Sequence, residues 1–251
     1  DPHTEGAMDE YFKLIPKEKV YDKTGIQFMN FNSLFQLATM RRNNDSALEA
    51  ADKILFIPDA LMYMLTGEAV CEYTILSTSQ MLDPRTKRID PELIGAIGLR
   101  EEQFGRYVNP SDKVGVLTPE IQKMTGVGPV PVVAVAGHDT GAAVAAVPAQ
   151  NQNFAYLSCG TWSLLGIETK DAIINEKSFE YNFTNEGGIE GTTRFLKNIC
   201  GMWLLERCRQ EWTDAPSDVN QINSDAMTAP AFRSLINPDD PRFANPESMT
   251  K

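Results

Sequence analysis

His138 and Asp139 follow an apolar segment and precede a series of small residues in PVVAVAGHDTGAAVAAV, residues 131–147. The β-branched run over 126–137 predicts a strand buried on both faces, and the alanines after it predict a closely packed helix. Ligands bind at the carboxyl ends of strands in open α/β sheets, so Asp139 stands where a partly desolvated carboxylate can accept a proton from a hydroxyl. Each residue also has a structural interpretation. Asp139 is either this proton acceptor or the N-cap of the helix, and His138 is either a donor to a ligand oxygen or a structural imidazole.

A second candidate is the turn Gly160-Thr161 in LSCGTWS, residues 157–163. A Gly-Thr turn at the end of a strand exposes backbone N–H groups and one hydroxyl, which suit phosphate oxygens. The same residues are also common in ordinary hairpins. The segment contains neither GxxxxGK[ST] nor GxGxxG, so a P-loop is excluded there.

The third candidate is Asn198, within the segment Thr193–Trp212 that we predict to be one long helix. Its apolar residues form two adjacent stripes, the first containing Phe195, Ile199 and Trp203, so the helix is expected to be mostly buried. An Asn on such a helix must be hydrogen-bonded, either to neighbouring backbone or to a ligand hydroxyl. Glu206 is most simply a solvated helix charge.

Composition narrows the function classes. The chain has 251 residues, of which 42% are apolar, and its 23 Lys and Arg against 34 Asp and Glu give a formal net charge of -11. This charge disfavours nucleic acid and anionic membranes as partners, although backbone N–H groups can still bind a small anion. The four cysteines show no metal-ligand spacing, so no metal site is predicted and a reducing cytoplasm is the expected location. No signal peptide or spanning segment is present in the sequence.

Local signals place the elements around these candidates. SALEAADKILF predicts a helix with Ser46 as N-cap, and IPDALMYMLTGE predicts one with Pro58 at its start and Gly67 past its end. The polar stretch 81–120 predicts short helices and turns, and NFAYLSCGTWSLLGIE a strand that turns at 159–161. The tail, residues 237–251, predicts a loop. The composition favours α/β architecture, with a domain boundary near 148–153.

Several segments together resemble the FGGY carbohydrate kinases in order and spacing. They are KILFIPDALMYMLTGEAVCEYTILSTSQMLD, VVAVAGHDTGAAVAAVP, AYLSCGTWSLLGIE and TNEGGIEGTTRFLKNICGMWLLERCRQEW. Within the family, TGIQFMNFNSLFQL and the His-Asp-Thr turn look most like members that act on L-rhamnulose. The resemblance covers most of the chain. It implies an α/β, actin-like (ribonuclease H-like) two-domain fold, with residues 1–147 in the sugar-binding domain and 148–251 in the nucleotide-side domain.

The resemblance also implies roles for residues. Asp139 resembles the catalytic base, which deprotonates a sugar hydroxyl for attack on the γ-phosphate of ATP. His138, Thr140 and Asn198 resemble sugar contacts, and Gly160 and Thr161 the phosphate-side contacts of ATP. ATP with Mg²⁺ is the implied cofactor and L-rhamnulose 1-phosphate the implied product. The position of Glu206 is one where the family leads us to expect Gln near ATP.

Two other functions are compatible with the same residues. Another kinase of the family, acting on L-fuculose, xylulose or a polyol, would keep Asp139; a non-catalytic sugar-binding protein could lose it. The sequence leaves the oligomeric state open, a homo-oligomer included. It does not open with Met, and the resemblance places a phosphate loop before Asp1 and an adenosine motif after Lys251. We therefore expect a central segment of a longer kinase, with little or no turnover by itself.

Overall fold

The computed structural model describes residues 2–151, 153–213, 216, 218–243 and 246–250. Residues 1, 152, 244–245 and 251 belonged to the opening, the boundary and the tail considered above, and they lie outside this description. The chain divides into two compact units. Unit 1 consists of Asp1–Tyr156 with Gly166–Lys197, and unit 2 of Leu157–Leu165 with Asn198–Lys251. Each is described by itself.

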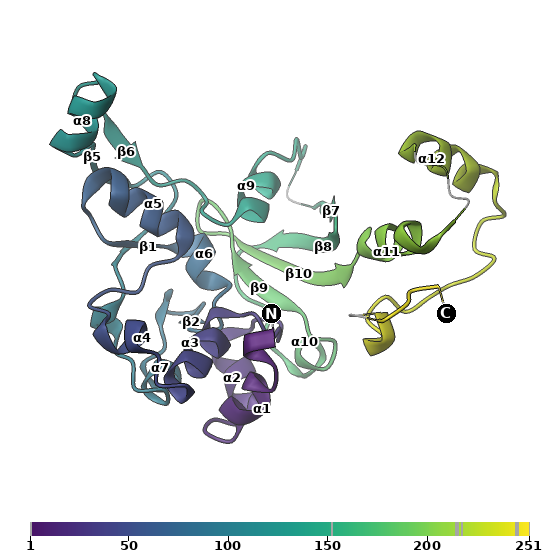
Figure 1. Ribbon diagram of the computed structural model, residues 1–251, viewed down its shortest axis with the longest axis horizontal. Coiled ribbons are helices and arrows are strands. Elements are labelled where there is room, and N and C mark those ends of the chain that lie inside the picture. The colour runs from purple at the N-terminus through teal and green to yellow at the C-terminus, as the bar shows by residue number, and fades with distance from the viewer. Residues whose placement is uncertain (1, 152, 214–215, 217, 244–245, 251) are drawn as a thin grey trace. The chain divides into compact units, whose positions relative to one another are not determined.

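The first part of unit 1 is helical (Figure 1), and the helix predicted over 46–56 is confirmed only for Ser46–Ala50. A short 3-10 helix, η1 (Pro2–Thr4), is followed by α1 (Ala7–Phe12), α2 (Lys17–Thr24), α3 (Ser33–Arg42), α4 (Ser46–Ala50) and α5 (Ile57–Thr66). The predicted signals of α5 are confirmed, because Pro58 lies in its first turn and Gly67 caps its end at φ 75°. The cap of α4 is Asp45 and not Ser46, since the Asp45 side chain accepts from the next two backbone N–H groups.

The main core of unit 1 lies among these helices and the short elements after them. Leu34, Phe35, Leu76 and Leu93 are fully buried there. Tyr11 packs edge-on against Phe35 and donates its hydroxyl to the carbonyl of Leu93 at 2.7 Å. This bond satisfies a polar group that the core would otherwise leave unpaired.

Over residues 70–133 the chain forms short helices and also strands, and of these strands only the one at 131–133 lies in a segment that the sequence predicted as a strand. The elements are β1 (Val70–Glu72), α6 (Tyr73–Ser77), β2 (Leu82–Asp83), β3 (Arg88–Ile89), α7 (Pro91–Gly95), η2 (Glu101–Gln103), β4 (Arg106–Val108), β5 (Lys113–Val116), α8 (Pro119–Thr125) and β6 (Pro131–Val133). The strands pair two by two: β1 with β4 in parallel, and β2 with β3 and β5 with β6 antiparallel. The helix α5 packs against β5 and β6 (Figure 1).

The prediction of a strand buried on both faces over 126–137 is wrong in its extent and its burial. Only β6 is extended in a ladder there, and Val133 is 49% exposed and Val135 70% exposed. The β-branched run has a single strand neighbour, β5, so only Ala134 in its centre is buried. The prediction of burial rested on composition alone. Burial depends instead on how many strands pair with the segment, and here only β5 does.

The prediction of a single helix over 193–212 is wrong for its first half, which is a strand. The structure has β10 (Thr193–Cys200), then Gly201 and Met202, then α11 (Trp203–Glu211). Four residues of β10 pair antiparallel with β9 (Thr184–Gly187). The pairing partner lies outside the local pattern, and tertiary context of this kind overrides helix propensity.

β9 and β10 belong to a four-stranded sheet with the order β7-β8-β10-β9, in which β7 is Ala155–Cys159 and β8 is Trp162–Thr169. These two strands confirm the predicted turn at 159–161. The sheet strands are shared between the units, with all of β9 in unit 1. The short helix α10 (Glu176–Glu180) precedes β9.

Residues 182–185 form hydrogen bonds with α2 and with the residues that follow it in unit 1. Gly25 ends α2 at φ 63°, and its carbonyl accepts from the backbone and side-chain N–H groups of Asn185, both at 2.9 Å. The Tyr21 hydroxyl donates to the carbonyl of Phe183 at 2.8 Å, and Asn182 Oδ1 accepts the N–H of Phe28 at 2.9 Å. A Cβ on Gly25 would lie 2.8 Å from Asn185, so this close approach requires glycine.

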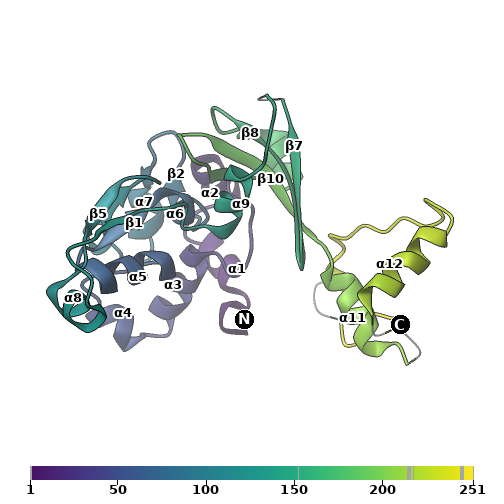
Figure 2. The ribbon, with the colours of Figure 1, turned by 90° about the horizontal axis from the view of Figure 1, so that it is seen from above.

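Unit 2 contains the turn between β7 and β8, α11, α12 (Val219–Thr228) and η3 (Pro241–Phe243), the last of these within the tail predicted as a loop (Figure 2). The Glu211 carboxylate accepts from Ser248, Met249 and Thr250, and these bonds lower its pKa to about 2. No helix in the described part of the chain has the length and apolar character needed to cross a membrane.

Candidate functional site

Asp139 opens the helix α9 (Asp139–Ala145), and its side chain is 97% exposed. Its Oδ1 accepts from the N–H of Thr140 at 2.6 Å and from the Thr140 hydroxyl at 3.3 Å. The N-cap residue is His138, so Asp139 does not cap this helix. The expected partial desolvation is not present, because no described side chain covers the carboxylate. The structure therefore presents an accessible proton acceptor on a short, defined turn.

Two buried residues, Glu72 and Thr74, accept hydrogen bonds from the backbone of the turn. Glu72 Oε2 accepts the N–H of Gly137 at 3.0 Å, and the Thr74 hydroxyl accepts the N–H of His138 at 3.1 Å. The Thr74 hydroxyl in turn donates to Glu72 Oε2 at 2.6 Å. Both side chains are fully buried, so the backbone just before Asp139 is fixed by groups that cannot exchange these bonds for water.

A second acid, Asp59, lies behind Glu72. Asp59 is fully buried, and its Oδ1 accepts the backbone N–H of Glu72 at 3.1 Å. Burial raises the pKa of Asp59 to about 7, and the nearby Glu72 carboxylate acts in the same direction. The turn thus rests on a pair of acids, of which one titrates near neutral pH.

The imidazole of His138 is held by residues from the pair β9–β10. Its Nδ1 lies 2.9 Å from Nη2 of Arg194 and 3.3 Å from Oε2 of Glu186. Its Nε2 lies 3.7 Å from Oδ1 of Asp139. The nitrogen Nδ1 is therefore engaged by buried charges, while Nε2 lies on the side of the exposed Asp139 carboxylate.

Gly160 and Thr161 form the exposed turn between β7 and β8 in unit 2. The Gly160 N–H donates to the carbonyl of Trp162 at 2.8 Å, so it is not the exposed donor that the sequence led us to expect. The Thr161 carbonyl accepts the N–H groups of Gly201 and Trp203. This fastens the first turn of α11 to the Gly-Thr turn.

A cavity of about 390 Å³ in unit 2 is lined by the Thr161 residue and by α11 and α12. Glu206 and Arg209 line it from α11, and their side chains form an ion pair of 2.8 Å. The Glu206 side chain is 53% exposed on α11, as expected of a solvated helix charge, and it is also paired with Arg209 beside the cavity. Thr161 and Glu206 both line this one cavity.

Asn198 lies half-buried on the strand β10, in unit 2, and not on a helix. The predicted residues therefore form two groups. His138, Asp139 and Thr140 are consecutive at the start of α9 in unit 1, and Gly160 and Thr161 form the turn in unit 2. The sequence missed four residues that support the first group: Glu72, Thr74, Glu186 and Arg194. No local signal marks them, because each acts on a turn at least 48 residues away by way of the fold.

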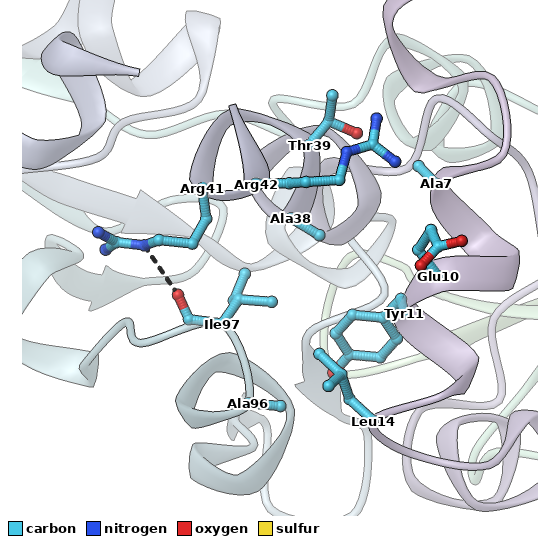
Figure 3. Close-up of a pocket in the computed structure, with 10 residues that line it drawn as sticks. All are labelled: Ala7, Glu10, Tyr11, Leu14, Ala38, Thr39, Arg41, Arg42, Ala96 and Ile97. Carbon is cyan, nitrogen blue, oxygen red and sulfur yellow. Dashed lines mark hydrogen bonds between the residues drawn. The ribbon is translucent and has the colours of Figure 1, made fainter. Parts of the chain in front are cut away.

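Another cavity, of about 250 Å³, lies in unit 1 between α1, α3 and the residues after α7 (Figure 3). Arg41 extends toward the carbonyl of Ile97, to which its Nε donates at 3.0 Å. None of the predicted site residues lines this cavity. Among the residues that the structure describes, no three His, Cys, Asp or Glu side chains gather as a metal site.

Comparison with known proteins gives a consistent family match. Residues 1–146 match the N-terminal domain of the FGGY family of carbohydrate kinases, and residues 155–251 match its C-terminal domain. The chain is 62% identical over 249 residues to a rhamnulokinase from Bacteroides thetaiotaomicron and 42% identical over 250 residues to one from Oceanobacillus iheyensis. Each match covers 99% of this chain but only 51% and 52% of the relative. The chain spans about half the length of the curated relatives it matches.

Solved structures of sugar kinases share the fold. A gluconate kinase from Lactobacillus acidophilus aligns with a TM-score of 0.78 at 18% identity, covering 92% of this chain and 46% of that one. A Plasmodium falciparum glycerol kinase with ADP aligns with a TM-score of 0.71 at 16% identity, covering 92% and 49%. The predicted α/β fold class of the actin-like sugar kinases is confirmed.

Proposed function

Because the chain belongs to the FGGY family of carbohydrate kinases, we propose that the whole protein phosphorylates L-rhamnulose with ATP, giving L-rhamnulose 1-phosphate and ADP. The observation that carries this proposal is the similarity to rhamnulokinases along nearly the whole chain, which includes the Asp139 turn. Residues 1–147 would form part of the sugar-binding domain, and 148–251 part of the nucleotide-side domain. Free thiols such as the buried Cys71 suit a reducing cytoplasm, where we place the protein.

Asp139 acts in this proposal as the general base. Its carboxylate accepts the proton of the sugar C1 hydroxyl while that oxygen attacks the γ-phosphorus; the new O–P bond forms as the bond to ADP breaks. Positioned general bases contribute roughly 10² to 10⁴ in rate. The exposure of Asp139 and the rigid support of its turn by Glu72 suit this role, because a substrate must reach the carboxylate in a fixed geometry. His138, Thr140 and Asn198 are the proposed sugar contacts.

Gly160 and Thr161 are the proposed contacts to the ATP phosphates. Thr161 lines the cavity of unit 2 together with Glu206 and Arg209, whose opposite charges are paired. We assign the phosphate hydrogen bond to the Thr161 hydroxyl, because the Gly160 N–H already donates to the carbonyl of Trp162. The role proposed for Gly160 is then only to leave room for the phosphate, since it carries no side chain. Mg²⁺ is usually bound by substrate phosphates with one or two carboxylates, and it neutralises phosphate charge during transfer.

The test is ADP release by the full-length protein with L-rhamnulose, L-fuculose, D-xylulose or glycerol as acceptor. We expect a preference for L-rhamnulose. Asp139→Asn keeps the size of the side chain and removes the base, so turnover should fall by about 10² or more. Asp52→Asn is the matched control, because Asp52 is another exposed aspartate and lies away from the turn.

Other results would contradict different parts of the proposal. Equal activity of wild type and Asp139→Asn would exclude Asp139 as the base. A preference for L-fuculose, xylulose or glycerol would keep the mechanism and change the substrate. Binding of a sugar without ADP release from any acceptor would favour a non-catalytic sugar-binding protein.

A further inference from the structure

Arg194 is a fully buried cation beside the Asp139 turn. It lies on β10 directly opposite Glu186 on β9, and its side chain has 0% exposure. Burying a guanidinium is costly unless its charge is balanced and its N–H groups are bonded. The contacts of the Arg194 guanidinium therefore show how its buried charge is compensated.

Three contacts surround the guanidinium: two hydrogen-bond contacts, at Nε and Nη2, and one ion pair at Nη1, which has no hydrogen-bond partner among the described residues. Its Nε donates to the carbonyl of Gly187 at 3.0 Å, and its Nη1 lies 3.2 Å from Glu186 Oε2. Its Nη2 lies 2.9 Å from His138 Nδ1. The group also lies directly under α9, since a Cβ on Gly141 would be 3.5 Å from Nη2. The first two contacts fix and neutralise the cation, and the third reaches the turn.

The third contact determines which ring nitrogen carries the proton. An arginine side chain stays protonated and can only donate, so His138 Nδ1 must accept. Nδ1 then has no hydrogen, and the neutral ring carries its hydrogen on Nε2. Glu186 alone would favour the opposite arrangement, with a hydrogen on Nδ1. Arg194 prevails because it is nearer to Nδ1, at 2.9 Å against 3.3 Å, and because the same Glu186 oxygen also faces Arg194 Nη1.

We infer that Arg194 is a positioning residue, which holds His138 as the Nε2–H tautomer so that this N–H is presented beside Asp139. Its value rests on the proposed function: an Nε2–H at this place can donate to a hydroxyl oxygen of the sugar while Asp139 accepts the proton. The opposite tautomer would offer an acceptor there and would compete with Asp139 for that proton. Arg194 touches neither the sugar nor ATP in this arrangement.

The variants must separate positioning from charge balance. Arg194→Met alone leaves Glu186 buried without its cation and is expected to destabilise the fold. The double variant Arg194→Met/Glu186→Met removes both charges together, a change that is often neutral for stability. Arg88→Met/Glu101→Met is the matched control, because it removes another Arg–Glu pair, of 2.7 Å, from the surface of unit 1.

In the full-length enzyme we expect the Arg194/Glu186 double variant to keep its thermal unfolding midpoint but to lose about 10- to 100-fold in kcat/KM for the sugar, the same range as the loss of a residue that orients a metal-bound histidine. The KM for ATP should stay unchanged. The Arg88/Glu101 control should match the wild type in both. A purely structural role for Arg194 predicts instead that the folded double variant has wild-type kinetics, and that result would overturn the inference.

A direct readout uses no activity. In ¹⁵N-histidine-labelled protein at neutral pH, with the signals assigned by their loss in His138→Gln, the Nδ1 of His138 should resonate as an unprotonated nitrogen and Nε2 as a protonated one. Arg194→Lys, which keeps a cation opposite Glu186 but has a single donor nitrogen in place of the guanidinium fork, should weaken this pattern. A protonated Nδ1 in the wild type would overturn the inference even if every sugar is phosphorylated. If no sugar is phosphorylated, the proposed function fails and the spectrum still decides the role of Arg194.

Discussion

Among single residues, Asp59 and Glu72 set the conditions under which the Asp139 turn keeps its shape. Glu72 accepts the N–H of Gly137, and Asp59 accepts the N–H of Glu72, so the two acids form a chain from the core to the turn. Both are fully buried, and burial raises the pKa of Asp59 to about 7. The protonation of one residue is therefore linked to the stability of the structure that carries the proposed base.

Asp59 predicts a pH dependence of stability. Its pKa is about 7 in the folded protein and near 4 in the unfolded chain, so the folded state binds this proton more tightly. The contribution is fully present below about pH 4 and is lost as the pH rises to about 7. Asp59→Asn keeps an acceptor at Oδ1 and removes the titration. We expect its unfolding midpoint in urea, relative to the wild type, to be higher at pH 8 than at pH 5.

The comparison is made between variants because other carboxylates act in the opposite sense. The pKa of Glu211 is lowered by its hydrogen bonds, for example, so it contributes stability that is lost toward low pH. Asp52→Asn provides the exposed control. A constant difference between Asp59→Asn and the wild type from pH 5 to pH 8 would show that Asp59 does not titrate in this range.

For helices and strands, the accuracy of prediction depended on how local the determining contacts are. Pro58 and Gly67 bounded α5 correctly because caps and φ preferences act within one turn. The position of Asp139 between a strand and a helix also followed from adjacent residues. The segment 193–200 failed because β9 decides its conformation, and Phe195 and Ile199 fit an apolar stripe in a helix as well as a half-buried strand. The support from Arg194 could not be predicted for the same reason.

Gly201 separates β10 from α11 and predicts a specific defect. A Cβ at this position would lie 2.4 Å from Ser163 Oγ and 2.8 Å from the Gly160 carbonyl oxygen. Gly201→Ala should therefore push the Gly160-Thr161 turn away, with a loss of about 1–3 kcal/mol in the free energy of unfolding. If the turn contacts ATP, the KM for ATP should rise. Equilibrium unfolding and initial rates at varied ATP concentration measure the two effects.

Gly95→Ala is the control for this substitution. Gly95 is at the exposed end of α7, and a Cβ there would meet nothing within 4 Å. The added methyl group should be neutral or slightly stabilising, because it restricts the unfolded chain. A Gly201→Ala protein as stable as Gly95→Ala, with an unchanged KM for ATP, would mean that the turn adjusts without cost.

In the whole molecule, the Asp139 turn and the Gly160-Thr161 turn are supported by separate sets of contacts. The Asp139 turn is fixed by residues of unit 1, and the Gly160-Thr161 turn by residues of unit 2. A Cβ on Gly137 would lie 3.0 Å from Glu72 and 3.3 Å from Pro58, all within unit 1. Substitutions in the two turns thus strain different surroundings.

Independence of the two turns is testable with the pair Gly137→Ala and Gly201→Ala. We expect Gly137→Ala to raise the KM for the sugar and Gly201→Ala to raise the KM for ATP. In the double variant, the two losses in free energy of unfolding should add to within about 0.5 kcal/mol. A coupling energy well above that value, measured by a double-mutant cycle on the full-length protein, would show that the turns share their support.

The bonds between Gly25 and Asn185 also bear on how the protein is made. The two residues are 160 positions apart, and with Tyr21, Phe28 and residues 182–183 they close the N-terminal helices of unit 1. Such distant contacts form slowly, because a long loop must close first. During synthesis, α2 leaves the ribosome long before its partner segment does. Part of the surface of the nascent helices therefore stays uncovered until residue 185 has emerged and unit 1 can close.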